Sequence, residues 1–152
     1  MAEAPHRIRP KSLNDYLEVM SKAVFQSGMS WKVVEAKWPG IREGFHGFDV
    51  DRVADMSEDE LDRLAENPQV IRNRKKLGAV AHNAARLQTL DAQPGGFRGF
   101  LRAEKGFEER LDRLNKEFKF LGDMGAYYFL YVVGERVPPH EESVERLAKR
   151  KR

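Results

Sequence analysis

Two glycines placed three positions apart, Gly122 and Gly125, interrupt a stretch of helical character that runs from Lys116 to Tyr128. A charged run with helical spacing precedes them and an apolar run follows, which predicts a helix, a tight turn and a second helix. We expect Gly122 to supply a positive φ, because glycine adopts that conformation at little cost. Asp123, or the turn itself, is then expected to cap the second helix.

The start of the second helix is the part of this turn that could bind a ligand. The first N–H groups of a helix have no partner inside it, so they can bind a phosphate group. An ordinary αα-hairpin has the same sequence pattern without binding anything. The turn alone leaves both readings open.

Basic residues are unevenly distributed along the chain. The last four residues are all basic, so the remainder of a chain of net charge +3 and pI 9.2 is slightly acidic. Residues 49–66 carry eight acids and two arginines, whereas residues 67–90 carry five basic residues and no acid: Arg72, Arg74, Lys75, Lys76 and Arg86. This basic segment predicts a surface that meets a phosphate backbone, and a solvated helix face is the alternative.

Length and composition narrow the class of protein. A chain of 152 residues with 41% hydrophobic and 34% charged residues predicts one globular domain with a sizeable core. No apolar run reaches the ~18 residues of a membrane span, and the N-terminus lacks the apolar segment of a signal peptide. The absence of cysteine excludes disulfides, thiolate zinc sites and a cysteine nucleophile. We therefore expect a cytoplasmic protein without membrane contact.

The apolar spacing predicts an all-α fold. We expect an extended arm over residues 1–11, one helical domain over residues 12–148 and a basic tail over residues 149–152. Pro39 is expected to start a short separate helix, and Asn67-Pro68 to cap and begin another. Other helices are expected from Leu13 to about Gln26, from Trp31 to about Lys37, from Arg74 to about Leu90 and from Glu141 to about Lys149. Shorter ones are expected after Ser57 and from Phe97, and two more flank the hairpin, the first led by Phe107, Leu111 and Leu114 and the second closed by Gly134.

Four segments resemble, in the same order, the bacterial DNA-3-methyladenine glycosylase I family of the helix-hairpin-helix glycosylase superfamily. They are Gln26–Trp31 (QSGMSW), residues 48–84 with their IRNR-K turn, Phe118–Gly122 (FKFLG), and the helix and turn around His140. The resemblance implies a two-lobed helical bundle with a cleft between the lobes and DNA across its mouth.

The resemblance also implies a mode of DNA binding that agrees with the hairpin reading. The family grips DNA through backbone N–H groups after the hairpin glycine, which here belong to Gly122, Asp123, Met124 and Gly125. Such contacts carry no sequence code. Asp123 departs from this pattern, since its carboxylate would repel a phosphate unless the side chain turns back to cap its helix.

Basic side chains beside the hairpin complete the expected DNA-binding face. They are Arg72, Arg74, Lys75 and Lys119, and they would release counterions when a duplex binds.

Base recognition would rest on two residues of the QSGMSW segment. Trp31 matches the family's pocket tryptophan and would stack on an extruded base, or else it is a core aromatic residue. Gln26 matches the glutamine of the same motif and either supports the backbone or touches the base.

Three features of the family are missing. Ala23 stands where the family has its base-reading glutamate, and the N-terminal tyrosine–histidine–tryptophan motif has no counterpart. The family's zinc site needs two cysteines and two histidines, of which only His140 is present, so we expect no metal and no cofactor.

Residues 139–146 follow the superfamily form P-V-D-x-x-V-x-R with Glu141 in place of the catalytic aspartate. Glu141 is therefore a candidate catalytic carboxylate, or simply an acid that favours a helix start.

Three functions remain open from the sequence. The first, which the resemblance implies, is a glycosylase that flips alkylated purines out of double-stranded DNA and hydrolyses the N-glycosidic bond as a monomer. The second is a non-catalytic DNA-binding homologue that keeps the hairpin and has lost the pocket. The third is a helical interaction module with neither property.

Overall fold

The structure, a computed structural model, describes residues 5–150, and its regular elements in that range are all helices joined by turns and loops. That range contains no strand, and the all-α expectation is confirmed. The helices are α1 (Leu13–Gln26), α2 (Trp31–Gly44), the 3₁₀ turn η1 (His46–Phe48), α3 (Val50–Ala54), α4 (Glu58–Ala65), α5 (Arg74–Asp91), α6 (Gly96–Arg102), α7 (Phe107–Glu117), α8 (Asp123–Val132) and α9 (His140–Arg150). None of the helices in this range has the length and apolar character that a membrane crossing requires.

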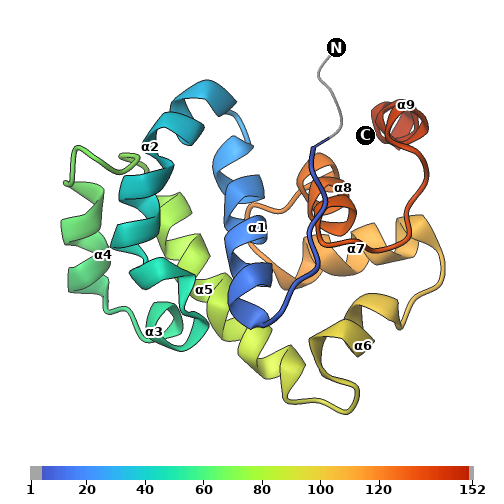
Figure 1. Cartoon of the computed structure of the whole chain (residues 1–152), viewed down its shortest axis with the longest axis horizontal. Helices are drawn as coiled ribbons and strands as arrows, with labels where there is room; N and C mark the ends of the chain where they lie inside the picture. The colour runs from blue at the N-terminus through green and yellow to red at the C-terminus, as the bar shows by residue number, and fades with distance from the viewer. Residues whose placement is uncertain (1–4, 151–152) are drawn as a thin grey trace.

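Two groups of helices lie on either side of α1 and α5 (Figure 1). The helices α2, α3 and α4 pack on one side, and α6, α7, α8 and α9 lie on the other (Figure 1). Helix α1 contacts both α5 and α8, while α5 contacts α3, α4 and α6. The two central helices therefore fix the position of one lobe relative to the other.

Helix α5 forms the middle of the hydrophobic core. Its residues Leu77, Val80, Ala84 and Leu87 are fully buried, as their helical spacing predicts. Asn73 caps this helix, because its side-chain oxygen accepts a hydrogen bond of 3.1 Å from the amide of Lys76. The helix expected over residues 74–90 is thus confirmed, with one more residue at its end.

The expected break at Pro39 is wrong, because α2 continues through this residue as one helix. Val34 and Ile41 lie seven residues apart, on the same face of a helix, and both are fully buried. Burying them together requires the helix to continue through the proline.

The helix expected to begin at Asn67-Pro68 is also wrong. The side-chain oxygen of Asn67 accepts the amide of Gln69 at 2.9 Å, which closes a local turn instead of capping a helix. The carbonyl oxygen of Pro68 then accepts a hydrogen bond of 2.8 Å from the ammonium group of Lys37, so the turn is held against α2.

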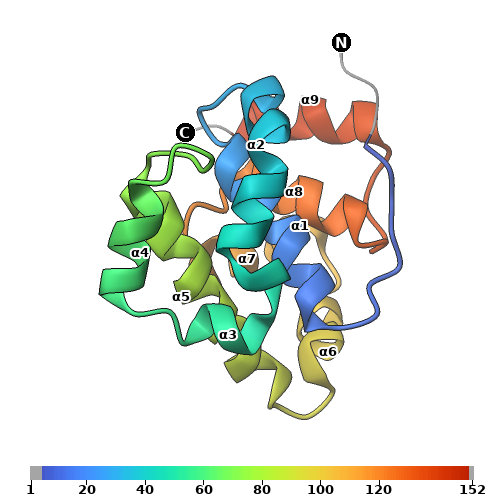
Figure 2. The same ribbon diagram turned by 60° about the vertical axis from the view of Figure 1, so that its left-hand side comes forward.

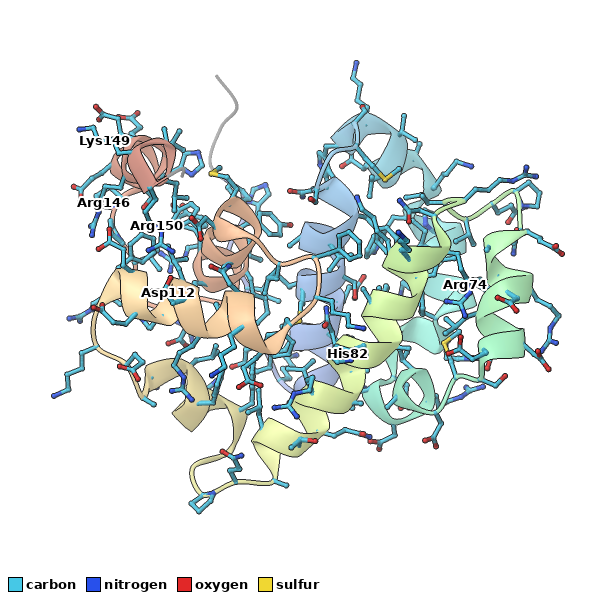
Figure 3. The ribbon with its side chains drawn as sticks, turned by 180° about the vertical axis from the view of Figure 1, so that it is seen from behind. Arg74, His82, Asp112, Arg146, Lys149 and Arg150 are labelled. Carbon is cyan, nitrogen blue, oxygen red and sulfur yellow. The ribbon has the colours of Figure 1, made fainter. Side chains whose placement is uncertain are left out.

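Helix α9 is fastened across the hairpin formed by α7 and α8. The guanidinium group of Arg150 lies 2.7 Å from the carboxylate of Asp112 and 3.1 Å from that of Asp123. Figure 3 shows Arg150, Asp112 and Arg146 gathered where these helices meet. Lys149 and Arg150, which the sequence places in a basic tail, belong to this helix, and the rest of that expected tail lies outside the described residues.

The N-terminal segment runs in an extended conformation beside α8 in both ribbon views (Figures 1 and 2). The amide of Ile8 donates to the carbonyl oxygen of Val132 at 2.7 Å. Arg7 donates to the carbonyl oxygens of Tyr131 and Glu135 at 2.9 and 2.7 Å. Residues 1–4 of the expected arm lie outside the described range.

We expect Gly40→Ala to lower the free energy of unfolding by about 1–3 kcal/mol, as overpacking does in a tight contact. A Cβ atom at this position would lie 2.3 Å from the carbonyl oxygen of Gln69, which is backbone and cannot move aside. The matched control is Gly122→Ala, because a Cβ there meets nothing within 4 Å. Urea unfolding of the two variants provides the measurement, and equal stabilities would contradict the close packing of α2 on the turn.

Candidate functional site

The hairpin between α7 and α8 reverses direction at Phe120, where φ is +56°. The expectation that Gly122 supplies the positive φ is wrong, because this residue has φ −75° and ψ −170°. Leu121 points into the core and is 3% exposed, so the reversal occurs one residue before it. A positive φ is uncommon outside glycine and marks Phe120 as a constrained position.

The N-terminal end of α8 is open to solvent. The amides of Asp123, Met124 and Gly125 have no hydrogen-bond acceptor within the described part of the chain. Gly122 and Met124 are exposed, and no atom lies within 4 Å of a Cβ built on Gly122. This end of the helix can therefore accept an anion at close range.

Asp123 does not cap its own helix, so of the two expected alternatives the cap by this side chain is wrong. Its two carboxylate oxygens each accept a hydrogen bond of 3.1 Å from Arg150. The expected conflict between this carboxylate and a phosphate is thus reduced by an arginine from α9, because the ion pair balances its charge.

Asn83 on α5 holds the hairpin in place. Its side chain is buried and accepts the amide of Lys119 at 2.8 Å, while its own amide group donates to the carbonyl oxygen of Lys119 at 3.1 Å. Asn115 adds a bond of 2.7 Å to the carbonyl oxygen of Leu121. These side-chain bonds fix the turn where the backbone offers no regular partner.

A cavity of about 530 Å³ lies directly beside this hairpin. Trp31 and Gln26, the two residues expected to read a base, both line it. Trp31 is 36% exposed, which excludes the alternative that it is a core aromatic residue. Aromatic and small side chains make up most of the wall, which comprises Pro5, Ala23, Gln26, Ser27, Trp31, Phe120, Gly122, Met124, Gly125, Tyr127, Tyr128 and His140.

The wall of this cavity carries no aspartate, glutamate, lysine or arginine among the residues that the structure describes. Burial raises the pKa of both Tyr127 and Tyr128, and a hydrogen bond from Gln26 partly offsets the effect at Tyr128. The hydroxyl of Tyr127 lies 3.4 Å from Nδ1 of His140. The cavity therefore offers π-faces and neutral hydrogen-bonding groups.

Ala23 of α1 faces Gly125 of α8 in this wall. A Cβ on Gly125 would lie 3.5 Å from the Cβ of Ala23 and 3.3 Å from Leu121. The methyl side chain of Ala23 leaves the volume beside it free, and the cavity occupies that volume.

Some side chains of the basic segment expected to face DNA form ion pairs within the protein instead. Arg74 lies 2.7 Å from Glu58 and 2.8 Å from Asp62, and Figure 3 shows it on the α4 side of α5. Arg86 pairs with Glu117 at 2.5 Å.

Lys76 is 4% exposed and donates to the carbonyl oxygen of Ser27, so it is not a surface cation. Burial lowers the pKa of Lys76. Arg72 and Lys75 remain exposed.

A second cavity, of about 630 Å³, lies on the other side of Phe120. Lys75, His82 and Lys119 line it together with Phe120, so this ring stands between the two cavities. Burial, with added repulsion from the charges of Lys119 and Arg86, lowers the pKa of His82. The groove is cationic near the hairpin, as a phosphate-binding surface requires.

Glu141 is exposed at the start of α9 and does not line the cavity, although the preceding residue His140 does. No cluster of three or more potential metal-ligating side chains occurs within the described range. Sequence reasoning did not find Asn83, Phe120, Tyr127 or Tyr128. The apolar run after the hairpin predicts a core helix, and periodicity alone cannot show that two of its tyrosines line a cavity.

Comparison with known proteins connects this arrangement to one family. The family model described as methyladenine glycosylase matches residues 10–117. The chain is 34% identical over 76 residues to the DNA-3-methyladenine glycosylase of Haemophilus influenzae. This match covers 50% of this chain and 41% of that protein. It is 41% identical over 59 residues to DNA-3-methyladenine glycosylase 1 of Escherichia coli, covering 39% and 32%. The matches thus span less than half the length of these curated relatives.

Solved structures extend the likeness beyond α7. A crystal structure of 3-methyladenine DNA glycosylase I superposes with a TM-score of 0.71 at 25% identity, over 84% of this chain and 81% of that one. The Staphylococcus aureus 3-methyladenine DNA glycosylase I gives a TM-score of 0.73 at 22% identity, over 84% and 79%, which shows the fold. The superpositions show that the chain has the all-helical fold of these DNA glycosylases. The chain belongs to the methyladenine glycosylase family, which confirms the resemblance seen in its sequence.

We expect Asn83→Ala to cost about 1–3 kcal/mol of stability, because it removes a buried side chain that pairs with both the partly buried N–H and the partly buried C=O of Lys119. Gln88→Ala on the same helix is the matched control, since its amide bonds to Asp51 at the surface. Chemical unfolding of both variants gives the comparison. A loss at Asn83 no larger than that at Gln88 would show that the hairpin does not depend on this side chain.

Proposed function

We propose that this protein is a DNA repair glycosylase that removes alkylated purines of the 3-methyladenine type from double-stranded DNA. The base is flipped out of the duplex into the cavity beside the hairpin, and the N-glycosidic bond is then hydrolysed. The observation that carries the proposal is the position of Trp31, on the wall of a cavity that also borders the free amides of α8.

The chemistry suits a cavity without charged groups. An N-alkylated purine in DNA is cationic, so aromatic faces attract it. When the glycosidic bond breaks, the base leaves as a neutral molecule and needs no proton from an acid. Water adds to the sugar carbon and loses a proton. Recognition and positioning by Trp31, Tyr128 and Gln26 therefore contribute more than strong acid–base catalysis would.

Glu141 remains our candidate for the carboxylate that orients water and stabilises the developing positive charge on the sugar. It follows His140, a residue of the cavity wall, and its side chain is exposed.

DNA would lie across the N-terminal end of α8. The amides of Asp123, Met124 and Gly125 would hold a phosphate of the damaged strand, with the small side of Gly122 allowing a close approach. Lys119, Lys75 and Arg72 would supply the surrounding positive charge, and Arg74 would add less, because two carboxylates already hold it.

A non-catalytic DNA-binding homologue is the second candidate, and one observation favours it. Ala23 stands where a base-reading carboxylate would be expected, and no acid from elsewhere in the described chain replaces it in the wall. Such a protein would bind duplex DNA through the same hairpin and release no base.

Release of 3-methyladenine from methylated duplex DNA by the purified protein tests the first candidate. We expect release above the spontaneous background, and a loss of about 10-fold or more in Trp31→Ala, since stacking on one aromatic ring is worth roughly 1–3 kcal/mol. Trp38→Phe is the control, because Trp38 packs on Phe48 away from this cavity.

Each outcome of the excision assay has a defined meaning. Tight duplex binding without any release supports the non-catalytic candidate. Full activity of Trp31→Ala would remove the cavity from the proposal. Glu141→Gln in the same assay tests the carboxylate separately, and full activity there would remove only the role of Glu141.

Charge reversal beside the hairpin tests the DNA-binding face. We expect Lys75→Glu combined with Lys119→Glu to weaken binding to any undamaged duplex about 10-fold or more at low salt, with little dependence on sequence. The slope of log affinity against log salt should also become shallower. The double variant Lys22→Glu and Lys105→Glu, which alters two exposed or half-buried lysines outside both cavities, is the control. Equal weakening in the control would show an effect of net charge alone.

A further inference from the structure

A third cavity, of about 670 Å³, lies at the opposite end of α8 from the hairpin. It is formed by the N-terminal segment, α6 and the chain that follows α8. Its wall carries five arginines and one acid: Arg7, Arg9, Arg98, Arg102, Arg136 and Glu135. We refer to it as the arginine cleft.

The fold itself uses two of these arginines. Arg102 binds the carboxylate of Glu135 with hydrogen bonds of 3.1 and 3.2 Å, and this glutamate is 4% exposed. Arg7 donates to two carbonyl oxygens at the C-terminal end of α8 and lies 4.5 Å above the ring of Tyr131. The only acid in the described wall and the negative end of the helix are thus both satisfied.

Three guanidinium groups remain available in the same cleft. Arg9, Arg98 and Arg136 are exposed, and their side chains have no hydrogen bond or ion pair with any described residue. Like charges gathered around one cleft repel each other, and an anion would relieve that repulsion. Arginine in particular matches phosphate, because its planar group donates two parallel hydrogen bonds.

We propose that the arginine cleft is a second DNA-binding site, which takes the phosphodiester backbone of a duplex other than the one held at the hairpin. No aromatic ring from residues 5–150 lines the cleft, and its uncharged wall consists of residues such as Ile8, Val133 and Val137. The cleft therefore has nothing on which a base could stack and reads charge alone, which suits a polymer backbone better than a nucleotide.

The placement of the two sites at opposite ends of α8 favours a separate duplex for each. Helix α8 has ten residues and is about 15 Å long. The amides at its N-terminal end point outward along the helix axis, so a strand bound there lies beyond that end. The arginine cleft begins after the other end of the helix, with Val133 and Gly134 in its wall. One protein molecule would then hold two stretches of DNA and could pass from one to the other without dissociating.

Sedimentation of the full chain with an excess of dye-labelled, undamaged duplex of about 12 base pairs, roughly one helical turn, tests this proposal at low salt. We expect two duplexes per wild-type protein and one fewer for the double variant Arg98→Glu and Arg136→Glu. The control Arg52→Glu with Arg63→Glu changes the net charge equally, at exposed positions on α3 and α4, and should bind as the wild type does.

Three results would overturn the proposal: one duplex per wild-type protein, an unchanged number for the Arg98/Arg136 variant, or an equal loss in the control. Arg98→Gln with Arg136→Gln provides a milder change should the charge reversal impair folding, which a thermal melt would reveal. An excision assay on the same variants distinguishes this proposal from the proposed glycosylase function. Loss of the second duplex with normal base release would show that the substitutions disrupt the arginine cleft and leave the glycosylase site intact.

Discussion

The pair of hydrogen bonds between the buried Asn83 side chain and the backbone of Lys119 is the interaction on which the site depends. Helix α5 packs against helices of both lobes, so a bond from its middle fixes the hairpin relative to the whole core. The turn has little regular backbone bonding of its own, and Phe120 within it has a positive φ. Without these hydrogen bonds, nothing would fix the hairpin, and with it the cavity wall and the amides of α8, relative to α5.

Local patterns in the sequence predict most of the fold, because helical spacing and caps act within a few residues. The buried face of α5 and the cap at Ser57 were both predictable in this way. The continuation of α2 through Pro39 was not predictable, since burial of Val34 and Ile41 against other helices outweighs the cost of a proline. Trp31 was predictable from its motif, whereas Tyr128 and Asn83 acquire their roles only through tertiary contacts.

The clusters of basic residues along the sequence also differ from the clusters that the folded chain forms. The basic segment after residue 67 is the most conspicuous one in the sequence, yet Lys76 is buried and Arg74 is neutralised by two acids. The arginine cleft gathers its residues from three separate parts of the chain, so no window of the sequence reveals it. The cavity beside the hairpin, in contrast, has no aspartate, glutamate, lysine or arginine among the described residues of its wall, and offers mainly aromatic faces.

The two tryptophans of this chain lie in opposite environments. Trp38 stacks on Phe48 at 5.4 Å and donates to Glu18, whereas Trp31 is partly open to solvent on the cavity wall. Ring stacking alters the emission of an indole, so a base entering the cavity would quench one fluorophore and leave the other as a constant internal reference. The fluorescence of Trp31 would thus report whether the cavity is occupied, and Trp38→Phe would leave Trp31 as the only tryptophan that emits.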